Sequence, residues 1–173
     1  MTKGFTLVEL LVSIAIFTIV MLMAISSLFS ILDLDRKAQS MKSVMNNLNF
    51  ALDSMAREIR VGSDYCVPVQ CNATNFSFHD YLGKVVHYEL QADGRVWETR
   101  EDLSSNQPIP LTAPEVHIEN DANQPVFVVI GHTPAGDQKQ PYVFMRLIGY
   151  AGVGKTQTDF SIQTTVSQRL FDQ

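Results

Sequence analysis

The sequence predicts an α+β protein in which one long N-terminal helix packs on an antiparallel β-sheet. Two observations predict the helix: no Pro or Gly interrupts the chain from Phe5 to Val61, and apolar residues in its second half recur at three- and four-residue spacing. A third observation predicts the sheet, because the rest of the chain reads as short alternating runs separated by turn-rich segments. The 173 residues are enough for one domain with an appendage.

The first half of the predicted helix is long and apolar enough to cross a membrane. Leu10–Leu32 contains no charged residue, and about 23 helical residues span roughly 35 Å, against about 30 Å for a hydrocarbon core. A secretory signal peptide and a plain membrane anchor are both considered. The run exceeds the usual apolar length of a signal peptide. Neither alternative explains Glu9, because a carboxylate at the edge of a bilayer is costly without a partner.

A third interpretation explains Glu9. The residues Gly4-Phe5-Thr6-Leu7-Val8-Glu9 resemble the processing motif of type IV pilins and the related pseudopilins. In that family a dedicated peptidase cuts after the glycine and methylates the new N-terminal residue, which is Phe5 in this chain. The resemblance implies a prepilin leader peptide at residues 1–4. It also implies that Glu9 of one subunit neutralises the α-ammonium group of a neighbour.

The same resemblance implies partners and a location. The expected partners are other pilin or pseudopilin subunits, the prepilin peptidase, the inner-membrane assembly platform, and membrane lipid before assembly. The protein would cross the cytoplasmic membrane once with its C-terminal domain outside the cytoplasm. It would then enter an extracytoplasmic fibre or reach the cell surface.

One difference from the major pilins bears on the type of subunit. Many major pilins carry a helix-kinking proline about 22 residues into the mature chain, and Ser26 stands at that position here. Together with the predicted multi-hairpin sheet, this favours a minor subunit. The chain is most similar to the J-type minor pseudopilins of type II secretion systems and to PilW-like minor pilins.

The two parts of the helix are expected to lie in different environments. Residues 5–32 form the membrane or fibre-core part, and residues 33–61 form an amphipathic continuation that ends at Gly62, acting as a C-cap. Residues 62–173 form the extracytoplasmic sheet domain. The apolar stripe of the continuation consists of Met41, Val44, Met45, Leu48, Leu52, Met55 and Ile59.

Strands are expected from Asn75 onward. The clearest signal is a hairpin, because alternating runs flank the sequence "QADG" and Asp-Gly favours a tight turn. The predicted strands are Lys84–Leu90, Arg95–Arg100, Glu115–Ile118, Val126–Gly131, Tyr142–Tyr150 and Asp159–Gln168.

The stretch Gly149–Thr156, "GYAGVGKT", satisfies the phosphate-loop pattern G-x-x-x-x-G-K-[ST]. A phosphate loop needs a helix after it, but Phe160, Ile162 and Thr164 alternate with polar residues, which is the periodicity of a strand. The sequence therefore favours a glycine-rich hairpin loop with Lys155 in solvent, and no nucleotide is expected.

The remaining chemical candidates are few. Cys66 and Cys71 form a possible disulfide, with two free thiols as the alternative. No cofactor and no metal ion are expected: the four histidines are scattered, and the segment Glu119–Asn123 lacks the distal acid of a calcium loop. The net charge of −5 argues against binding nucleic acid, which needs a basic face.

The sequence therefore predicts a structural fibre subunit and not an enzyme. The alternative function is a single-span membrane-anchored extracytoplasmic binding protein or adhesin. The mature N-terminus distinguishes the two, because only the fibre subunit would begin with methylated Phe5.

Overall fold

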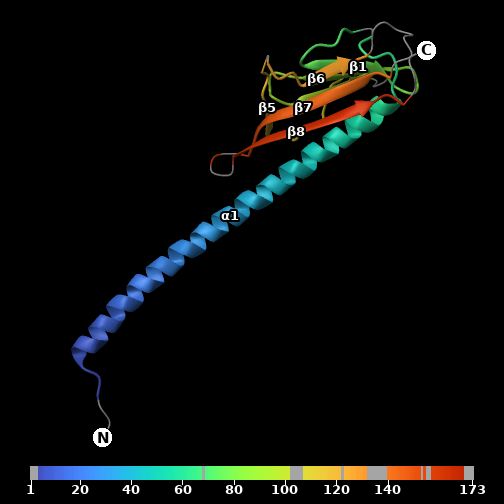
Figure 1. Ribbon diagram of the computed structural model, residues 1–173. Coiled ribbons are helices and arrows are strands. Elements are labelled where there is room, and N and C mark those ends of the chain that lie inside the picture. Colours follow the sequence, from blue (N-terminus) through green and yellow to red (C-terminus); the bar gives the residue numbers. More distant parts are fainter. Residues whose placement is uncertain are drawn as a thin grey trace. The chain divides into compact units, whose positions relative to one another are not determined.

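The chain begins with one uninterrupted helix, α1, over Leu7–Val61, in the computed structural model (Figure 1). Helix formation follows from the absence of Pro and Gly in this span. The helix begins two residues later than the sequence indicated and ends where it indicated. The structure describes residues 4–67, 69–101, 107–121, 123–131, 140–152, 154 and 157–169.

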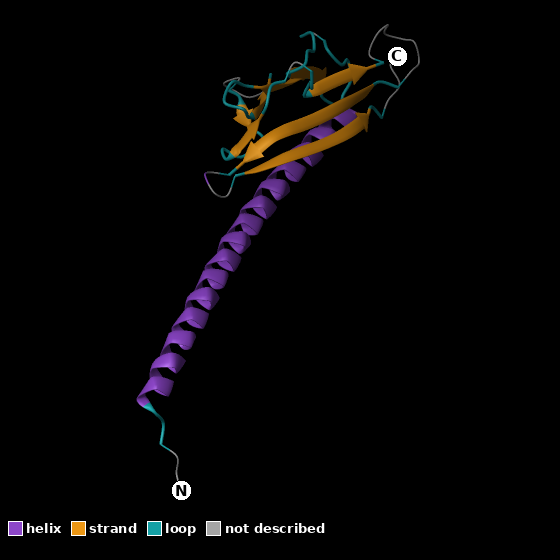
Figure 2. Cartoon of the chain, turned by 60° about the vertical axis from the view of Figure 1, so that its left-hand side comes forward, coloured by secondary structure: helices purple, strands orange, loops and turns teal. Residues whose placement is uncertain are grey.

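Two compact units make up the chain, Met1–Gln39 and Ser40–Gln173. The first unit contains the beginning of α1, and every one of its described residues is exposed. The second unit contains the end of α1 and all the strands. Figure 2 shows that the end of the helix lies against the strands of this second unit.

Gly62 follows the helix as expected, but it lacks the left-handed conformation that a C-cap glycine commonly takes. Its φ is not among the positive values of the described residues. Its N–H still closes the last turn on the carbonyl of Glu58, at 2.9 Å. A Cβ at Gly62 would lie 2.4 Å from Cδ2 of Phe78. The glycine is therefore required by the close approach of a strand and not by backbone conformation.

The first four strands form an antiparallel sheet, here called sheet A, in the order β1-β2-β3-β4. The predicted hairpin is confirmed: β2 pairs with β3 across the Gln91–Gly94 turn, in which Gly94 has a φ of 77°. The sequence did not predict β4, which is short and contains a proline. The strands of sheet A are β1 Asn75–His79, β2 Val85–Leu90, β3 Val96–Arg100 and β4 Ile109–Pro110.

The last four strands form a second antiparallel sheet, sheet B, which is built around β7. The strands β5 and β6 pair with opposite ends of one edge of β7, and β8 pairs with the other edge along its full length. The α+β class is confirmed, with two sheets in place of the one that the sequence suggested. The strands of sheet B are β5 Val116–Ile118, β6 Phe127–Ile130, β7 Tyr142–Ala151 and β8 Thr158–Ser167.

The core of the second unit lies between the helix and the two sheets. Five residues of the predicted apolar stripe are buried in it, and Met41 and Met45 are half-buried. Stacked Phe76 and Phe78, with ring centroids 5.3 Å apart, fill the side of sheet A. The buried stripe residues are Val44, Leu48, Leu52, Met55 and Ile59.

A charged cluster joins the helix to sheet A. Arg100 donates hydrogen bonds to the carboxylates of Glu58 on α1 and Glu98 on β3. The hydroxyl of Tyr88 donates to the other carboxylate oxygen of Glu58 at 2.8 Å. Glu98 is only 7% exposed. A buried carboxylate needs such partners, because an unpaired buried charge costs several kcal/mol.

Two pKa values are displaced in this cluster. Burial raises the pKa of the Tyr88 hydroxyl well above its ordinary value of 10.0, and the charges of Glu58 and Glu98 raise it further. Burial alone lowers the pKa of Arg100, but its hydrogen bonds to Glu58 and Glu98 outweigh burial, so that this pKa is raised. Arg100 therefore stays charged, and the folded protein favours the neutral form of Tyr88.

The raised pKa of Tyr88 predicts a loss of stability at alkaline pH. Above about pH 10 an unfolded tyrosine loses its proton, whereas the folded protein holds that of Tyr88, so the free energy of unfolding falls as the pH rises. Tyr88→Phe should flatten this fall and cost about 1 kcal/mol at neutral pH through the lost hydrogen bond. Urea unfolding of the full chain in detergent at pH 7 to 11 measures both effects. Exposed Tyr81 supplies the control, since Tyr81→Phe should keep the wild-type slope.

Candidate processing and assembly segment

The segment Gly4–Thr6 precedes α1 and is not helical. Apart from its chain neighbours, no described residue has a heavy atom within 4 Å of the position that a Cβ on Gly4 would take, and Phe5 is 79% exposed. The peptide bond between these two residues therefore lies in an open stretch of backbone. A protease can reach such a bond without unfolding the rest of the chain.

Thr6 caps the N-terminus of α1. Its Oγ1 accepts a hydrogen bond from the N–H of Glu9 at 3.3 Å, and its carbonyl accepts one from Leu10 at 3.2 Å. The pattern Thr-x-x-Glu is that of a capping box. Sequence reasoning missed this role of Thr6, although the pattern was visible in the letters "TLVE".

Glu9 is the acidic residue in the first turn of α1. A carboxylate is favoured there by the positive end of the helix dipole. Its side chain is exposed and makes no hydrogen bond or ion pair with the residues that the structure describes. Gly4, Phe5 and Glu9 thus lie together at one helix end, with the carboxylate available to another molecule.

The helix behind Glu9 presents apolar side chains on all sides. It is long and apolar enough to cross a membrane, and the apolar stretch is not buried by any described part of the chain. Three of the five hydroxyls in Leu10–Leu32 are satisfied within the helix itself, because each of the three donates to the carbonyl four residues earlier. These hydroxyls belong to Ser13, Thr18 and Ser26, at donor–acceptor distances of 2.7 to 2.9 Å.

Comparison with known families bears on this same segment. The prokaryotic N-terminal methylation motif matches residues 1–25. The match supports a type IV pilin-like family. That family is structural and not catalytic, and its motif implies assembly with other pilin subunits. The apolar helix is compatible with a single membrane anchor for such a protein. No curated protein and no solved structure matches the chain.

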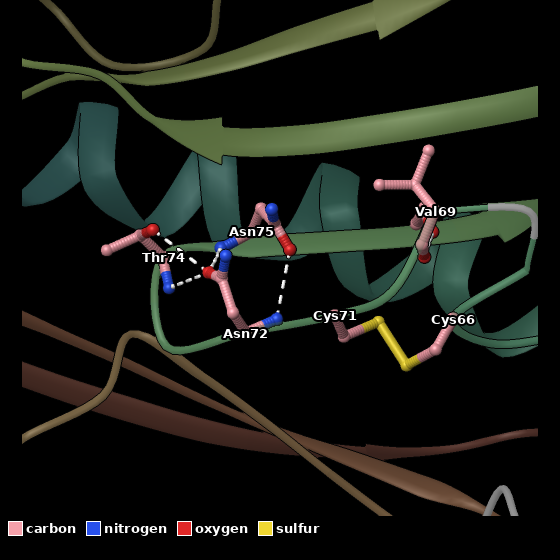
Figure 3. Close-up of a disulfide and its surroundings, with 7 residues drawn as sticks. Cys66, Val69, Cys71, Asn72, Thr74 and Asn75 are labelled. Carbon is pink, nitrogen blue, oxygen red and sulfur yellow. Dashed lines mark hydrogen bonds between the residues drawn. A yellow bond between two sulfur atoms is a disulfide. The ribbon is translucent and has the colours of Figure 1, made fainter.

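Cys66 and Cys71 are joined by a disulfide in the crossing from α1 to β1 (Figure 3). Just beyond it, Oδ1 of Asn72 accepts hydrogen bonds from the N–H and the hydroxyl of Thr74 and from the N–H of Asn75, at 2.8 to 3.0 Å. The Asn72 N–H in turn donates to the Asn75 side chain at 2.9 Å. The disulfide and this turn together fix where β1 begins.

The glycine-rich stretch Gly149–Thr156 begins within β7, which pairs with β8 as an antiparallel hairpin. A strand therefore follows this stretch where a phosphate loop requires a helix. Its first glycine, Gly149, lies within β7, where a Cβ would come 2.0 Å from the carbonyl oxygen of His117. Lys155 and Thr156 lie outside the described residues.

The other candidate ligands are not brought together in the described part of the chain, where no group of three or more His, Cys, Asp or Glu side chains can hold a metal ion. The ring of His117 lies 4.8 Å from that of Tyr150. Asp121 accepts a hydrogen bond from the N–H of Asn123 at 2.9 Å, as in an ordinary turn. His132 lies outside the described residues.

Reduction of the disulfide should destabilise the second unit. Closing so small a loop contributes about 2 kcal/mol in the chain-entropy treatment, which corresponds to a fall in Tm of roughly 5 to 10 °C. Thermal unfolding of the full chain in detergent, with and without dithiothreitol, measures this. The double variant Cys66→Ser/Cys71→Ser should melt at the lower temperature in both conditions. Equal Tm values for the oxidised and reduced wild type would contradict a stabilising role.

Proposed function

We propose that this protein is a structural subunit, of the minor kind, of a type IV pilus or a type II secretion pseudopilus. The observation that carries the proposal is the long apolar helix surface, which no described part of the chain covers. It lies directly behind an open Gly4–Phe5 bond and Glu9, whose carboxylate has no partner among the described residues. Lipid covers such a surface before assembly, and the helices of neighbouring subunits cover it afterwards. The methylation motif supports the processing step.

In this proposal, a prepilin peptidase cuts after Gly4 and methylates the amino group of Phe5. Residues 5–32 anchor the chain in the cytoplasmic membrane, with residues 62–173 outside the cytoplasm. The assembly platform then moves the subunit into the fibre. There Glu9 pairs with the α-ammonium group of a neighbour, and because an unpaired charge in an apolar bundle is costly, the pair sets the axial position of adjacent subunits.

A single-span anchored binding protein or adhesin is the second candidate, favoured by the compact sheet unit that follows the anchor. Intact-mass analysis of the protein from its own membranes separates the two. A chain that starts at methylated Phe5 supports the fibre subunit, and a chain that retains Gly4 supports the anchored protein.

Gly4→Leu should block processing. A Cβ at position 4 has no atom of the described residues within 4 Å, its chain neighbours apart, so an effect of the substitution reports on the peptidase and not on folding. The variant should stay in the membrane with its leader attached and without the methyl group, as measured by intact mass. Thr6→Ser, which keeps the capping hydroxyl, is the control and should be processed normally. Maturation of Gly4→Leu to Phe5 would remove the proposed cleavage site.

Glu9→Ala should be inserted and cleaved normally but should not assemble. The helix cap is kept, because it uses the backbone N–H of Glu9. The neighbour's ammonium group would stay unpaired at a cost of several kcal/mol. Co-purification with other fibre subunits from detergent-solubilised membranes, together with cleavage state, is the measurement. Glu9→Asp should be intermediate, since it keeps the charge with a shorter reach. Full co-purification of a cleaved Glu9→Ala chain would exclude the pairing role.

A further inference from the structure

The last strand, β8, forms a long border of sheet B. It pairs with β7 over ten residues, and within the described part of the chain no strand pairs with its other edge. Figures 1 and 2 both show β8 at the margin of the sheet. The N–H and C=O groups on this outer edge therefore need hydrogen-bond partners outside sheet B.

The register shows which residues those are. The N–H of Arg146 donates to Val126, and the carbonyl of Ile148 accepts from Glu119, so the even-numbered residues of β7 face β5 and β6. The odd-numbered residues of β7 consequently bond to β8, where their partners are even-numbered. The N–H and C=O groups of the odd-numbered β8 residues point away from β7. These residues are Asp159, Ser161, Gln163, Thr165 and Ser167.

All five of these residues are exposed. Their five N–H and five C=O groups form an uninterrupted row, because the described residues make hydrogen bonds to this edge only after Ser167. There Gln168 donates to the carbonyl of Pro141 at 3.0 Å, and Arg169 donates to that of Arg60 at 2.8 Å. The edge from Asp159 to Ser167 is thus a complete and accessible half of a strand pair.

The other sheet borders are short or covered. The outer edge of β1 is bonded to the crossing segment, through the Ser63–His79 bridge and the N–H of Cys66. The strands β4, β5 and β6 have only two, three and four residues. Proteins commonly protect a long edge with Lys, Pro or a bulge, but β8 contains no Lys, Arg, Pro or Gly, and its single charge is Asp159.

We propose that the outer edge of β8 is a strand-addition site, on which an extended segment of a neighbouring fibre subunit pairs with residues 159–167 and continues sheet B. This inference rests on the proposed function, which places other subunits beside this chain. Strand addition of this kind supplies affinity through main-chain hydrogen bonds and specificity through alternate side chains.

The edge also specifies the chemistry of the added segment. On the core side, Phe160 and Val166 are buried and Ile162 is half-buried, so alternate residues of the segment are apolar and extend the core. On the other face the segment is polar, with a basic residue opposite Asp159.

The occupant is not the β8 of a second copy in antiparallel pairing. Antiparallel pairing of two β8 edges needs a two-fold axis perpendicular to the strand. In Figures 1 and 2, β8 runs in roughly the same direction as the end of α1. Such an axis would therefore reverse the helix direction, whereas subunits that leave one membrane in the same orientation keep their helices parallel.

Proline substitution tests the edge without breaking the fold. The N–H of Gln163 points outward, so Gln163→Pro removes a donor from the added strand and none from the β7 ladder. Gln163→Ala keeps the N–H and is the matched control. We expect Gln163→Pro to reduce co-purification with fibre subunits about tenfold, and Gln163→Ala to leave it unchanged. Both variants should be cleaved at Gly4 and melt near the wild-type Tm.

Amide hydrogen exchange of the wild type gives a second readout. In the detergent-solubilised chain, amides of the even-numbered β8 residues should exchange slowly and those of Ser161, Gln163 and Thr165 should exchange fast. In isolated fibres the odd-numbered amides should slow to match. A photo-reactive residue at 163 should cross-link in membranes to an extended segment of another subunit. The same group at exposed Leu82 should not.

Three results would overturn the proposal: equal co-purification of Gln163→Pro and Gln163→Ala, fast exchange of the odd-numbered amides in fibres, or cross-links from position 163 to a helix or to lipid alone. A cross-link to the β8 of a second copy would replace the proposed occupant with self-association. A chain that keeps its leader and never enters fibres contradicts the proposed function instead. The cross-linking experiment, which needs only membranes, then tests whether an extended segment of another subunit lies against the β8 edge.

Discussion

The apolar surface of the first unit governs the behaviour of the whole protein. Fully burying one large apolar side chain is worth about 1.5 to 3 kcal/mol, and the exposed Leu, Ile, Val, Phe and Met residues of this helix are numerous enough for the sum to reach tens of kcal/mol. A domain is stable by only about 5 to 15 kcal/mol. The surface therefore needs a medium or a partner. The helix suits a membrane because its backbone groups are hydrogen-bonded internally, as are the hydroxyls of Ser13, Thr18 and Ser26.

Beyond Leu32 the same helix changes its surroundings. Charged residues appear at Asp33, Asp35 and Arg36, and from Val44 onward one face is buried by the chain's own sheets. The second unit therefore has a hydrophobic core of its own, and the Glu58–Arg100 pair joins the helix to sheet A beside it. The apolar surface of the first unit is available to other molecules. This difference explains why one continuous helix contains no buried residue before Val44 and six buried residues from Val44 to Ile59.

Local patterns in the sequence predicted the elements well. The uninterrupted helix, its apolar stripe, and the hairpin around Gly94 all follow from spacing and turn chemistry within short windows. The features that were missed depend on residues far apart in the chain. Glu58 and Arg100 are 42 positions apart, and the need for glycine at position 62 comes from Phe78. The split into two sheets arises because β5, β6 and β8 all pair with β7, whereas β1 to β4 pair with one another. No local pattern predicts that choice of partners.

The Glu9 carboxylate and the β8 edge would do different work in a fibre. A strand that slides along β8 by two residues, about 6.8 Å, keeps its side chains on the same faces and meets an equivalent row of backbone groups. The edge alone therefore tolerates several positions of similar energy. A buried ion pair tolerates only one, because moving the carboxylate by a few ångströms leaves two charges without partners in an apolar bundle. Main-chain pairing at β8 would thus contribute attraction between subunits, and the single charge at Glu9 would select among the registers that this attraction permits.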